Sequence, residues 1–324
     1  MTETTPLELP TAAAVFAAAN AIRPYIVRTP LIELHHSGRR PIYLKLENLQ
    51  PIGSFKLRCA ANALLSRLAT GCLEVTTASA GNFAQGLAYA GRRLGVRVTT
   101  VVPDTAAKTK LQALERLGAQ IIVRPYSQWW EMMEHTDPAQ NDPSFIHPVV
   151  DSAVLAGNGT IAAEILEDLP EVQTVFAPFG GGGLAVGVAA AMHAHRPDVR
   201  VYACESEAGT PVAAAFEAGR PVRIEFNSRT FITGMGSSSV LASMWPLIQQ
   251  EIAGTCCSSL EGVARMIKRL LIEHHIVAEG AGAVPVAAAL NASDDPSPAV
   301  CIVSGGHLDP EHLKEILDDR VPSA

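Results

Sequence analysis

Charge and aromatic side chains are scarce in this sequence, and several common signals are missing from it. Of the 324 residues, 18% are charged and 5% are aromatic, and the net charge is −7. Because no basic run is present, nucleic acid is not expected as a partner. The apolar runs are too short to cross a bilayer, so no membrane partner is expected. Met1 to Thr5 shows no signal-peptide pattern, which favours a cytoplasmic protein.

The cysteines also lack any pattern that would assign them a function. None forms a C-x-x-C pair, and none has a histidine partner at zinc spacing. We therefore expect reduced, mostly buried thiols and no metal site. The six are Cys59, Cys72, Cys204, Cys256, Cys257 and Cys301.

What is present is a globular composition, 48% hydrophobic, with strand-like and helical runs in alternation. This alternation predicts an α/β fold of two lobes, with parallel-type twisted sheets flanked by helices. We expect a small α/β domain over residues 61–147, inserted in a large domain over 1–60 and 148–324. The predicted strands are Ile42–Glu47, Glu74–Ala78, Val98–Val102, Gln120–Arg124, Thr174–Pro178, Arg200–Cys204 and Ala299–Val303. The predicted helices are Thr11–Ile22, Leu57–Leu68, Phe83–Leu94, Thr105–Leu117, Val154–Leu169, Gly183–His195, Thr210–Ala218, Ser239–Ile252, Leu260–Glu273, Gly280–Leu290 and Pro310–Leu317, with a helix and then a loop over 127–147.

Lys56 stands where the first predicted strand gives way to a helix, the place where α/β proteins bind ligands. A lysine beside Phe55 and small residues can lose its proton and act as an amine nucleophile that forms a Schiff base. By itself, the pattern is more typical of a surface lysine at a helix start, although the helix dipole disfavours a cation there. The other loops therefore decide between the two interpretations.

Three further loops follow predicted strands and can share one sheet edge with Lys56. Ser79–Gly86 opens a helix with small residues, which suits a carboxylate or a phenolic oxygen. Gly180–Gly183 places four consecutive glycines before a helix, which favours a phosphate, although the lysine of a nucleoside-triphosphate loop is missing. In Ser304–His307, the serine hydroxyl can donate to a neutral ring nitrogen; a plain turn is the alternative.

Together these loops describe a site for pyridoxal phosphate (PLP) and an amino acid. The sequence resembles the fold type II, tryptophan-synthase-β-like PLP enzymes, and within them the threonine and serine dehydratases and the serine racemases. The resemblance covers nearly the whole chain. It is carried most specifically by Gly53–Arg58, Ser79–Asn82 and Phe179–Leu184.

The resemblance implies a role for each matching residue. Lys56 holds the PLP aldehyde and is the catalytic base, with Phe55 beside the ring and Ser304 facing the pyridine nitrogen. Glu279 matches a family glutamate near the ring, and Gly234 a backbone wall of the pocket. The implied phosphate ligands are Gly180, Gly181, Gly182, Gly183 and Leu184. The implied carboxylate loop is Ser79, Ala80, Gly81, Asn82 and Phe83, in which Asn82 also contacts the ring hydroxyl.

The implied reaction is removal of the α-proton and the β-hydroxyl of L-threonine or L-serine, which yields a 2-oxo acid and ammonia. Serine racemases have a second serine where this chain has Ala80, so elimination fits better than racemisation. They also bind a divalent metal, and here Glu205 is present but Pro211 replaces the second carboxylate. Because the sequence ends at Ala324, no regulatory domain is expected.

Other departures concern the substrate. Phe83, His307 and the segment Phe231–Ser239 differ from the dehydratase pattern, in which an acidic residue precedes Gly234. These differences either enlarge the pocket for a substituent such as phenyl or leave a threonine pocket unchanged. 3-Hydroxyaspartate is less favoured, because the pocket loops contain no spare Arg or Lys. A PLP-binding protein without turnover is a further alternative, and the family makes a homodimer or homotetramer the expected assembly.

Overall fold

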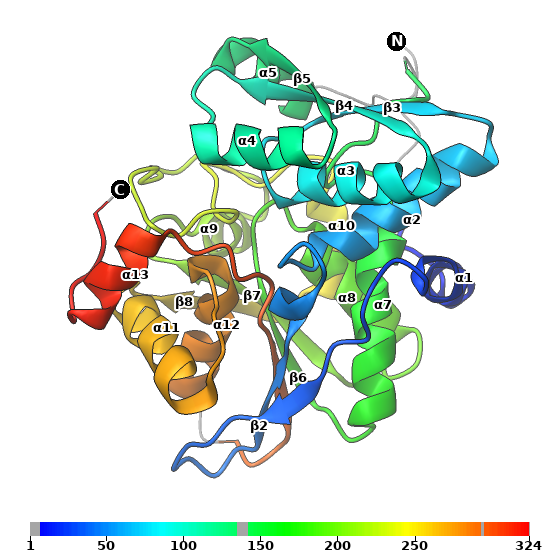
Figure 1. Ribbon diagram of the computed structural model, residues 1–324. Coiled ribbons are helices and arrows are strands. Elements are labelled where there is room, and N and C mark those ends of the chain that lie inside the picture. The colour runs from blue at the N-terminus through cyan, green and yellow to red at the C-terminus, as the bar shows by residue number, and fades with distance from the viewer. Residues whose placement is uncertain (1–6, 135–141, 293–294, 324) are drawn as a thin grey trace.

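The computed structural model describes residues 7–134, 142–292 and 295–323, and two sheets organise it (Figure 1). The large sheet has the order β1-β2-β9-β6-β7-β8 and the small sheet the order β3-β4-β5. All neighbouring strands are parallel except β1 and β2. The strands are β1 (Leu31–Glu33), β2 (Ile42–Lys45), β3 (Glu74–Ala78), β4 (Arg97–Pro103), β5 (Gln120–Arg124), β6 (Thr174–Pro178), β7 (Arg200–Ser206), β8 (Gly254–Ser258) and β9 (Ala299–Ile302).

Helices cover both sheets, and most of them begin and end close to the predicted residues. They are α1 (Ala12–Ile22), the 3-10 turn η1 (Glu47–Leu49), α2 (Lys56–Ala69), α3 (Asn82–Leu94), α4 (Lys108–Arg116), α5 (Tyr126–Glu134), α7 (Ser152–Asp168), α8 (Gly183–His193), α9 (Pro211–Ala218), α10 (Trp245–Glu251), α11 (Leu260–His274), α12 (Gly280–Asn291) and α13 (Pro310–Leu317). Thr11 caps α1 by accepting a hydrogen bond from the Ala14 backbone N–H. None of the helices in the described ranges is long and apolar enough to span a membrane.

The prediction of a small α/β unit inserted in a larger one is confirmed. The small sheet, with α3, α4 and α5, forms the small lobe, and its strands are consecutive in sequence between β2 and β6. The remaining elements form the large lobe, which lies below the small lobe in Figure 1. Helix α2 packs against both α3 and α7 and so connects the lobes. The exact domain boundaries remain a prediction.

The core of the large lobe lies on both faces of its sheet. On β6, Val175 and Ala177 belong to one hydrophobic cluster with α7, α8 and α10, whereas Phe176 belongs to another with α11 and α12. The alternation arises because successive strand side chains point to opposite faces. Both faces are therefore closed by helices, and the carboxyl ends of the strands remain available for a site.

Some elements differ from the sequence prediction. Strands β1 and β8 were not predicted, because one is three residues long and the other, Gly-Thr-Cys-Cys-Ser, lacks large apolar residues. Helix α10 begins at Trp245 rather than Ser239, and α4 begins at Lys108 rather than Thr105. The helix predicted at the start of 127–147 is confirmed as α5. Part of the loop predicted to follow it, residues 135–141, lies outside the described residues.

Beneath the start of α2, four charged side chains form a buried ion network. Arg58 makes paired hydrogen bonds of 2.7–2.8 Å to the carboxylates of Glu47 and Glu164. Lys45 donates to Glu164 and to the Thr29 carbonyl, each at 2.6 Å. Two positive and two negative charges balance within the network, which offsets the cost of removing them from water. The network joins β2, α2 and α7 and so anchors the helix that begins at Lys56.

Candidate active site

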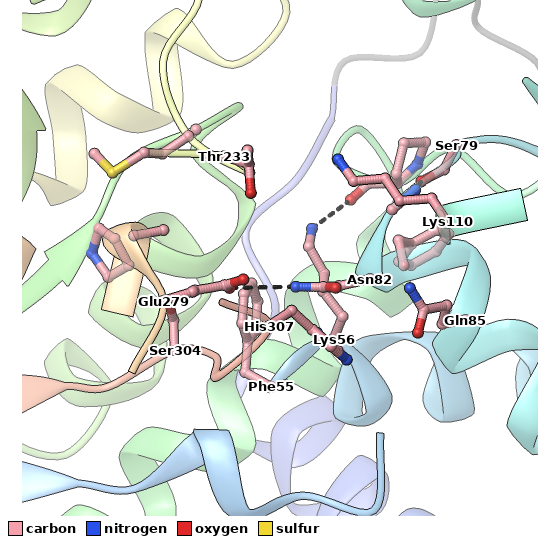
Figure 2. A pocket seen from close by; sticks show the side chains of 18 of the residues that line it. Phe55, Lys56, Ser79, Asn82, Gln85, Lys110, Thr233, Glu279, Ser304 and His307 are labelled. Carbon is pink, nitrogen blue, oxygen red and sulfur yellow. Dashed lines mark hydrogen bonds between the residues drawn. The ribbon is translucent and has the colours of Figure 1, made fainter. Parts of the chain in front are cut away.

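One cavity of about 660 Å³ brings the four predicted loops together. It lies between the lobes, at the carboxyl ends of β2, β3, β6 and β9, and Figure 2 shows side chains that point into it. Every predicted site residue except Ala80 lines this cavity. Those that do are Phe55, Lys56, Ser79, Gly81, Asn82, Phe83, Gly180, Gly181, Gly182, Gly183, Leu184, Gly234, Glu279 and Ser304.

Ala80 turns away from the cavity into the small lobe. It packs against a cluster formed by Ala84, Val102 and Leu114. A methyl group in that position can neither bind a substrate carboxylate nor move a proton. In the predicted carboxylate loop, only the other four residues face the cavity.

Lys56 is the first residue of α2, and its side chain extends into the cavity rather than into solvent (Figure 2). Its Nζ lies 3.4 Å from the carbonyl oxygen of Pro148, and the rings of Phe55 and Phe83 flank it. Burial lowers the pKa of Lys56, while nearby Cys59 opposes that shift. A lysine with a lowered pKa has a larger neutral fraction, which is the form that attacks a carbonyl carbon.

The glycine loop reaches its conformation through close contacts that exclude side chains. A Cβ on Gly181 would lie 2.6 Å from Cγ2 of Val149, and one on Gly180 would lie 3.0 Å from the Gly234 carbonyl oxygen. Gly182 has a φ of +96°, in the left-handed region that favours glycine. Helix α8 begins directly after it, so its first N–H groups, which have no partner within the helix, adjoin the loop.

The second loop ends where α3 begins at Asn82. The preceding Gly81 provides no side-chain cap, so the first N–H groups of α3 remain available to an anion. Ser79 is held in place because its Oγ accepts from the Gly81 N–H and its carbonyl oxygen accepts from the Thr100 hydroxyl. Nδ2 of Asn82 donates across the cavity to Oε1 of Glu279 at 3.3 Å (Figure 2).

Glu279 is buried immediately before α12. Burial raises the pKa of Glu279 to about 7, although the charge of Lys110 and hydrogen bonds from Asn82 and the His307 backbone oppose the shift. A Cβ on Gly305 would overlap the Glu279 carboxylate, so any other residue there would displace that carboxylate. The carboxyl group can therefore hold or release a proton near neutral pH.

The fourth loop is tied directly to the first. The Phe55 N–H donates to the Ser304 carbonyl at 3.0 Å, and the Gly306 N–H donates to the Gly53 carbonyl at 2.9 Å. The Ser304 side chain is buried and lines the cavity. These two hydrogen bonds fix the backbone at Ser304 to the start of α2. The positions of Ser304 and Lys56 relative to each other are therefore fixed.

Sequence analysis missed the contribution of α4. Lys110 and Arg116 line the cavity. The pocket loops contain no spare Arg or Lys, as stated above, but this helix adds two cations that the loops do not show. A signal was present, because Lys108 and Lys110 place two cations at a helix start, where the dipole disfavours them. A residue that is unfavourable for the local secondary structure, such as a lysine at a helix N-terminus, often has a role in a functional site.

Glu205, considered above as a metal ligand, instead caps α9. Its carboxylate accepts hydrogen bonds from the backbone N–H groups of Val212 and Ala213 at 2.8 and 3.1 Å. Burial raises its pKa to about 7, and those two bonds oppose the shift. Within the described ranges, no three His, Cys, Asp or Glu side chains are grouped to hold a metal ion.

Comparison with known proteins agrees with this geometry. A family model described as pyridoxal-phosphate dependent enzyme matches residues 22–305. An L-threonine ammonia-lyase from Geobacter sulfurreducens is 34% identical over 318 residues, which cover 95% of this chain and 78% of the relative. The chain belongs to the PLP-dependent enzyme family.

Solved structures of PLP enzymes share the fold. A threonine deaminase from T.th. matches with a TM-score of 0.79 and 31% identity, covering 93% of this chain and 99% of that one. A pyridoxal 5'-phosphate-dependent aspartate racemase matches with a TM-score of 0.83 and 26% identity, covering 96% and 99%. The fold type II interpretation is thereby confirmed.

The cavity fits the cofactor of this family. The glycine loop lines the cavity directly before the start of α8, so its N–H groups and those of the first turn of α8 suit a phosphate. Lys56 presents an amine of lowered pKa for the PLP aldehyde, and Ser304 offers a hydroxyl for the ring nitrogen. Asn82 offers an amide for the ring oxygen. These four features lie on separate loops that only the folded chain brings together.

Proposed function

We propose that this protein is a PLP-dependent ammonia-lyase that converts a β-hydroxy amino acid into a 2-oxo acid and ammonia. L-Threonine is the preferred substrate in this proposal, with L-serine as a second. The observation that carries it is the Lys56 amine, which faces one cavity with the glycine loop and the start of α3. The names of the relatives, L-threonine ammonia-lyase and threonine deaminase, support the same reaction.

Each part of the cavity has a task in this proposal. When bound, PLP withdraws electrons from the α-carbon of the amino acid, which makes its C–H bond acidic. Lys56, whose amine faces the cavity, would be the base that takes that proton. The N–H groups at Gly81 and Asn82 hold the substrate carboxylate and orient the C–H bond. Ser304, which carries no negative charge, would offer the ring nitrogen a hydroxyl hydrogen bond but no carboxylate to hold a proton on it.

Elimination is favoured over racemisation by the position of Ala80. Racemisation needs a second acid–base group on the opposite face of the α-carbon from Lys56. Ala80 packs into the small lobe against Ala84 and has no exchangeable proton. The proposal therefore predicts 2-oxo acid formation without appreciable D-amino acid.

The experiment is a 2-oxo-acid assay on purified, PLP-loaded protein with L-threonine, L-serine, threo-phenylserine and 3-hydroxyaspartate. Lys56→Ala is the blank, and Lys108→Ala, an exposed lysine outside the cavity, is the matched control. Activity on threonine or serine that is lost only in Lys56→Ala supports the proposal. Bound PLP with no 2-oxo acid from any substrate contradicts it. A phenylserine preference of about tenfold, or roughly 1.4 kcal/mol, would instead assign Phe83 and residues 231–239 to a larger pocket.

We also infer a homodimer or homotetramer that works in the cytoplasm. Phe16 on α1 is 71% exposed and Val27 is 45% exposed, and contact with a second copy would remove such apolar surface from water. Sedimentation of the holoenzyme tests the assembly, and a monomer at all concentrations would contradict it. Cell fractionation tests the location.

A further inference from the structure

Lys110 projects from α4 into the outer part of the cavity, toward the wall formed by Thr233 and Glu279 (Figure 2). Burial lowers the pKa of His307, and the charge of Lys110 lowers it further; the same charge opposes the burial that raises the pKa of Glu279. Lys110 therefore acts electrostatically across the space between the lobes. In the part of the chain that the structure describes, its ammonium group makes no hydrogen bond or ion pair with another residue. Lys110 is thus a cation that faces the cavity without a fixed partner.

The carboxylates that line the same cavity are already engaged. Glu279 accepts a hydrogen bond from Asn82 at 3.3 Å. Asp309 caps α13 by accepting from the Glu311 N–H at 2.9 Å. Neither neutralises Lys110 by direct contact. Arg116, on the same helix, adds a second positive charge to this wall.

The anions needed for the basic reaction have separate binding groups. The glycine loop and the start of α8 suit the phosphate, and the start of α3 suits the α-carboxylate. Lys56 is assigned to the PLP aldehyde and to removal of the α-proton, so it is not available to bind a further anion. The charge of Lys110 is therefore in excess of what threonine needs, since the methyl group on the β-carbon of threonine is neutral.

We propose that Lys110 is a specificity-determining residue that allows the enzyme to accept β-hydroxy amino acids with a second carboxylate on the β-carbon, of which 3-hydroxyaspartate is the simplest. This inference rests on the proposed function, because it concerns the same site and the same elimination. Thr233 supports it, since a neutral residue on the facing wall does not repel the second carboxylate. This substrate is disfavoured by the sequence only because the loops hold no spare cation, and α4 supplies two, Lys110 and Arg116.

The reaction balances without a further reactant. The Cα–H and Cβ–OH bonds of 3-hydroxyaspartate break, and water leaves. The resulting enamine becomes an imine, and water hydrolyses its C–N bond to give oxaloacetate and ammonia. No oxidant or reductant is needed, and Lys110 changes no bond: it holds the second carboxylate.

The test compares Lys110→Met with wild type on a matched pair of substrates, L-threonine and L-3-hydroxyaspartate in both threo and erythro forms. These amino acids differ only in a methyl or a carboxylate group on the β-carbon and in configuration there. Lys108→Met is the matched control, because Lys108 lies on the same helix but does not line the cavity. We expect kcat/KM for hydroxyaspartate to fall about tenfold in Lys110→Met, with threonine changed less than about twofold and Lys108→Met unchanged.

Two further measurements distinguish binding of the second carboxylate by Lys110 from binding of the PLP phosphate. Raising the salt from about 0.05 to about 0.5 M should weaken hydroxyaspartate turnover in wild type but have little effect in Lys110→Met, because salt screens an exposed charge. The PLP affinity of Lys110→Met, measured by cofactor titration, should equal that of wild type. A lower PLP affinity would assign Lys110 to the phosphate and overturn the proposal.

The other possible results of the substrate comparison distinguish failure of the Lys110 proposal from failure of the proposed function. An equal loss for both substrates in Lys110→Met would place Lys110 at the α-carboxylate and overturn the proposal. Wild-type activity on threonine with none on either hydroxyaspartate would also overturn it, while leaving the ammonia-lyase function intact. Activity on none of these substrates would contradict the proposed function itself.

Discussion

Asn82 of the small lobe and Glu279 of the large lobe meet across the cavity, with Nδ2 3.3 Å from Oε1. The bond uses one N–H of the Asn82 amide, and we propose that the other binds the ring oxygen of PLP. Glu279 therefore orients the amide, and a proton on Glu279 changes how strongly it accepts that bond. Protonation of the buried Glu279 carboxyl is therefore coupled to the strength of its hydrogen bond with Asn82, which joins the two lobes.

Glu279→Gln should remove a pH dependence of stability from the protein without PLP. The pKa of Glu279 is about 7 in the fold and lies above its unfolded value, so the fold binds the proton more tightly. Stability from this group is present below the unfolded pKa and is lost as pH rises through about 7, by up to about 3 kcal/mol. Measured by thermal unfolding, the stability of Glu279→Gln relative to wild type should rise between about pH 5 and about pH 8. A pH-independent difference would contradict the assignment.

Gly181→Ala should lower the affinity for PLP, because the added Cβ would lie 2.6 Å from Val149 Cγ2 and push the loop out of place. We expect a weakening of about tenfold or more, measured by cofactor titration. The double variant Gly181→Ala, Val149→Ala makes room for the Cβ and should recover part of that loss. If the double variant binds PLP no better than Gly181→Ala, the steric explanation is wrong.

Removing one member of the buried ion network should be strongly destabilising. In Arg58→Met, the Glu47 carboxylate stays buried without its cation, which costs about 3–5 kcal/mol. Arg97→Met is the matched control, since the pair of Arg97 with Glu74 is exposed and should contribute less than about 1 kcal/mol. Urea unfolding of the three proteins measures both values. Similar losses for the two variants would contradict a special role for the network.

His193 should make the junction of α8 and α10 sensitive to pH. Its Nδ1 lies 2.7 Å from the Glu251 carboxylate, and that hydrogen bond raises the pKa of His193 against the opposing effect of burial. The stabilisation is fully present below the unfolded pKa of about 6.5 and is lost as pH rises through the folded pKa. His193→Gln should therefore cost more stability at about pH 5.5 than at about pH 8.5, by about 1 kcal/mol or less because the group is partly exposed. Urea unfolding at both pH values tests this, and an equal cost at both would contradict it.

The parts of the site that could be predicted are those with a local signature. Lys56 at a helix start, the four glycines and Asn82 each have a meaning that depends on a few neighbouring residues. The parallel strands then bring their carboxyl ends to one edge, so the convergence of these loops also follows from the pattern. The strand over 174–178 and the helix over 183–195, which ends at His193 in the structure, were also predictable, since both are mainly apolar and the four glycines lie at the junction between them.

What could not be predicted depends on contacts between distant segments. Lys110 reaches the cavity only because the small lobe places α4 opposite Glu279. Two lysines at the start of α4 indicate an unusual helix start, but the local sequence does not show which surface they face. Ala80 lies inside a matching motif but packs with Leu114 instead of facing the cavity. Strand β8 forms because β7 offers an edge to pair with, although its own sequence has little strand character.

The strand order of the large sheet has a consequence for synthesis on the ribosome. Strand β9 follows every other strand of the two sheets in sequence and pairs with β2 on one side and β6 on the other, so β2 cannot gain its inner neighbour until the chain as far as Ile302 has emerged. The small sheet needs only residues 74–124 and can assemble much earlier. During translation the nascent chain therefore holds a formed small lobe beside an incomplete large one. The cofactor pocket, which needs both lobes, can arise only after β9 and Ser304 have emerged.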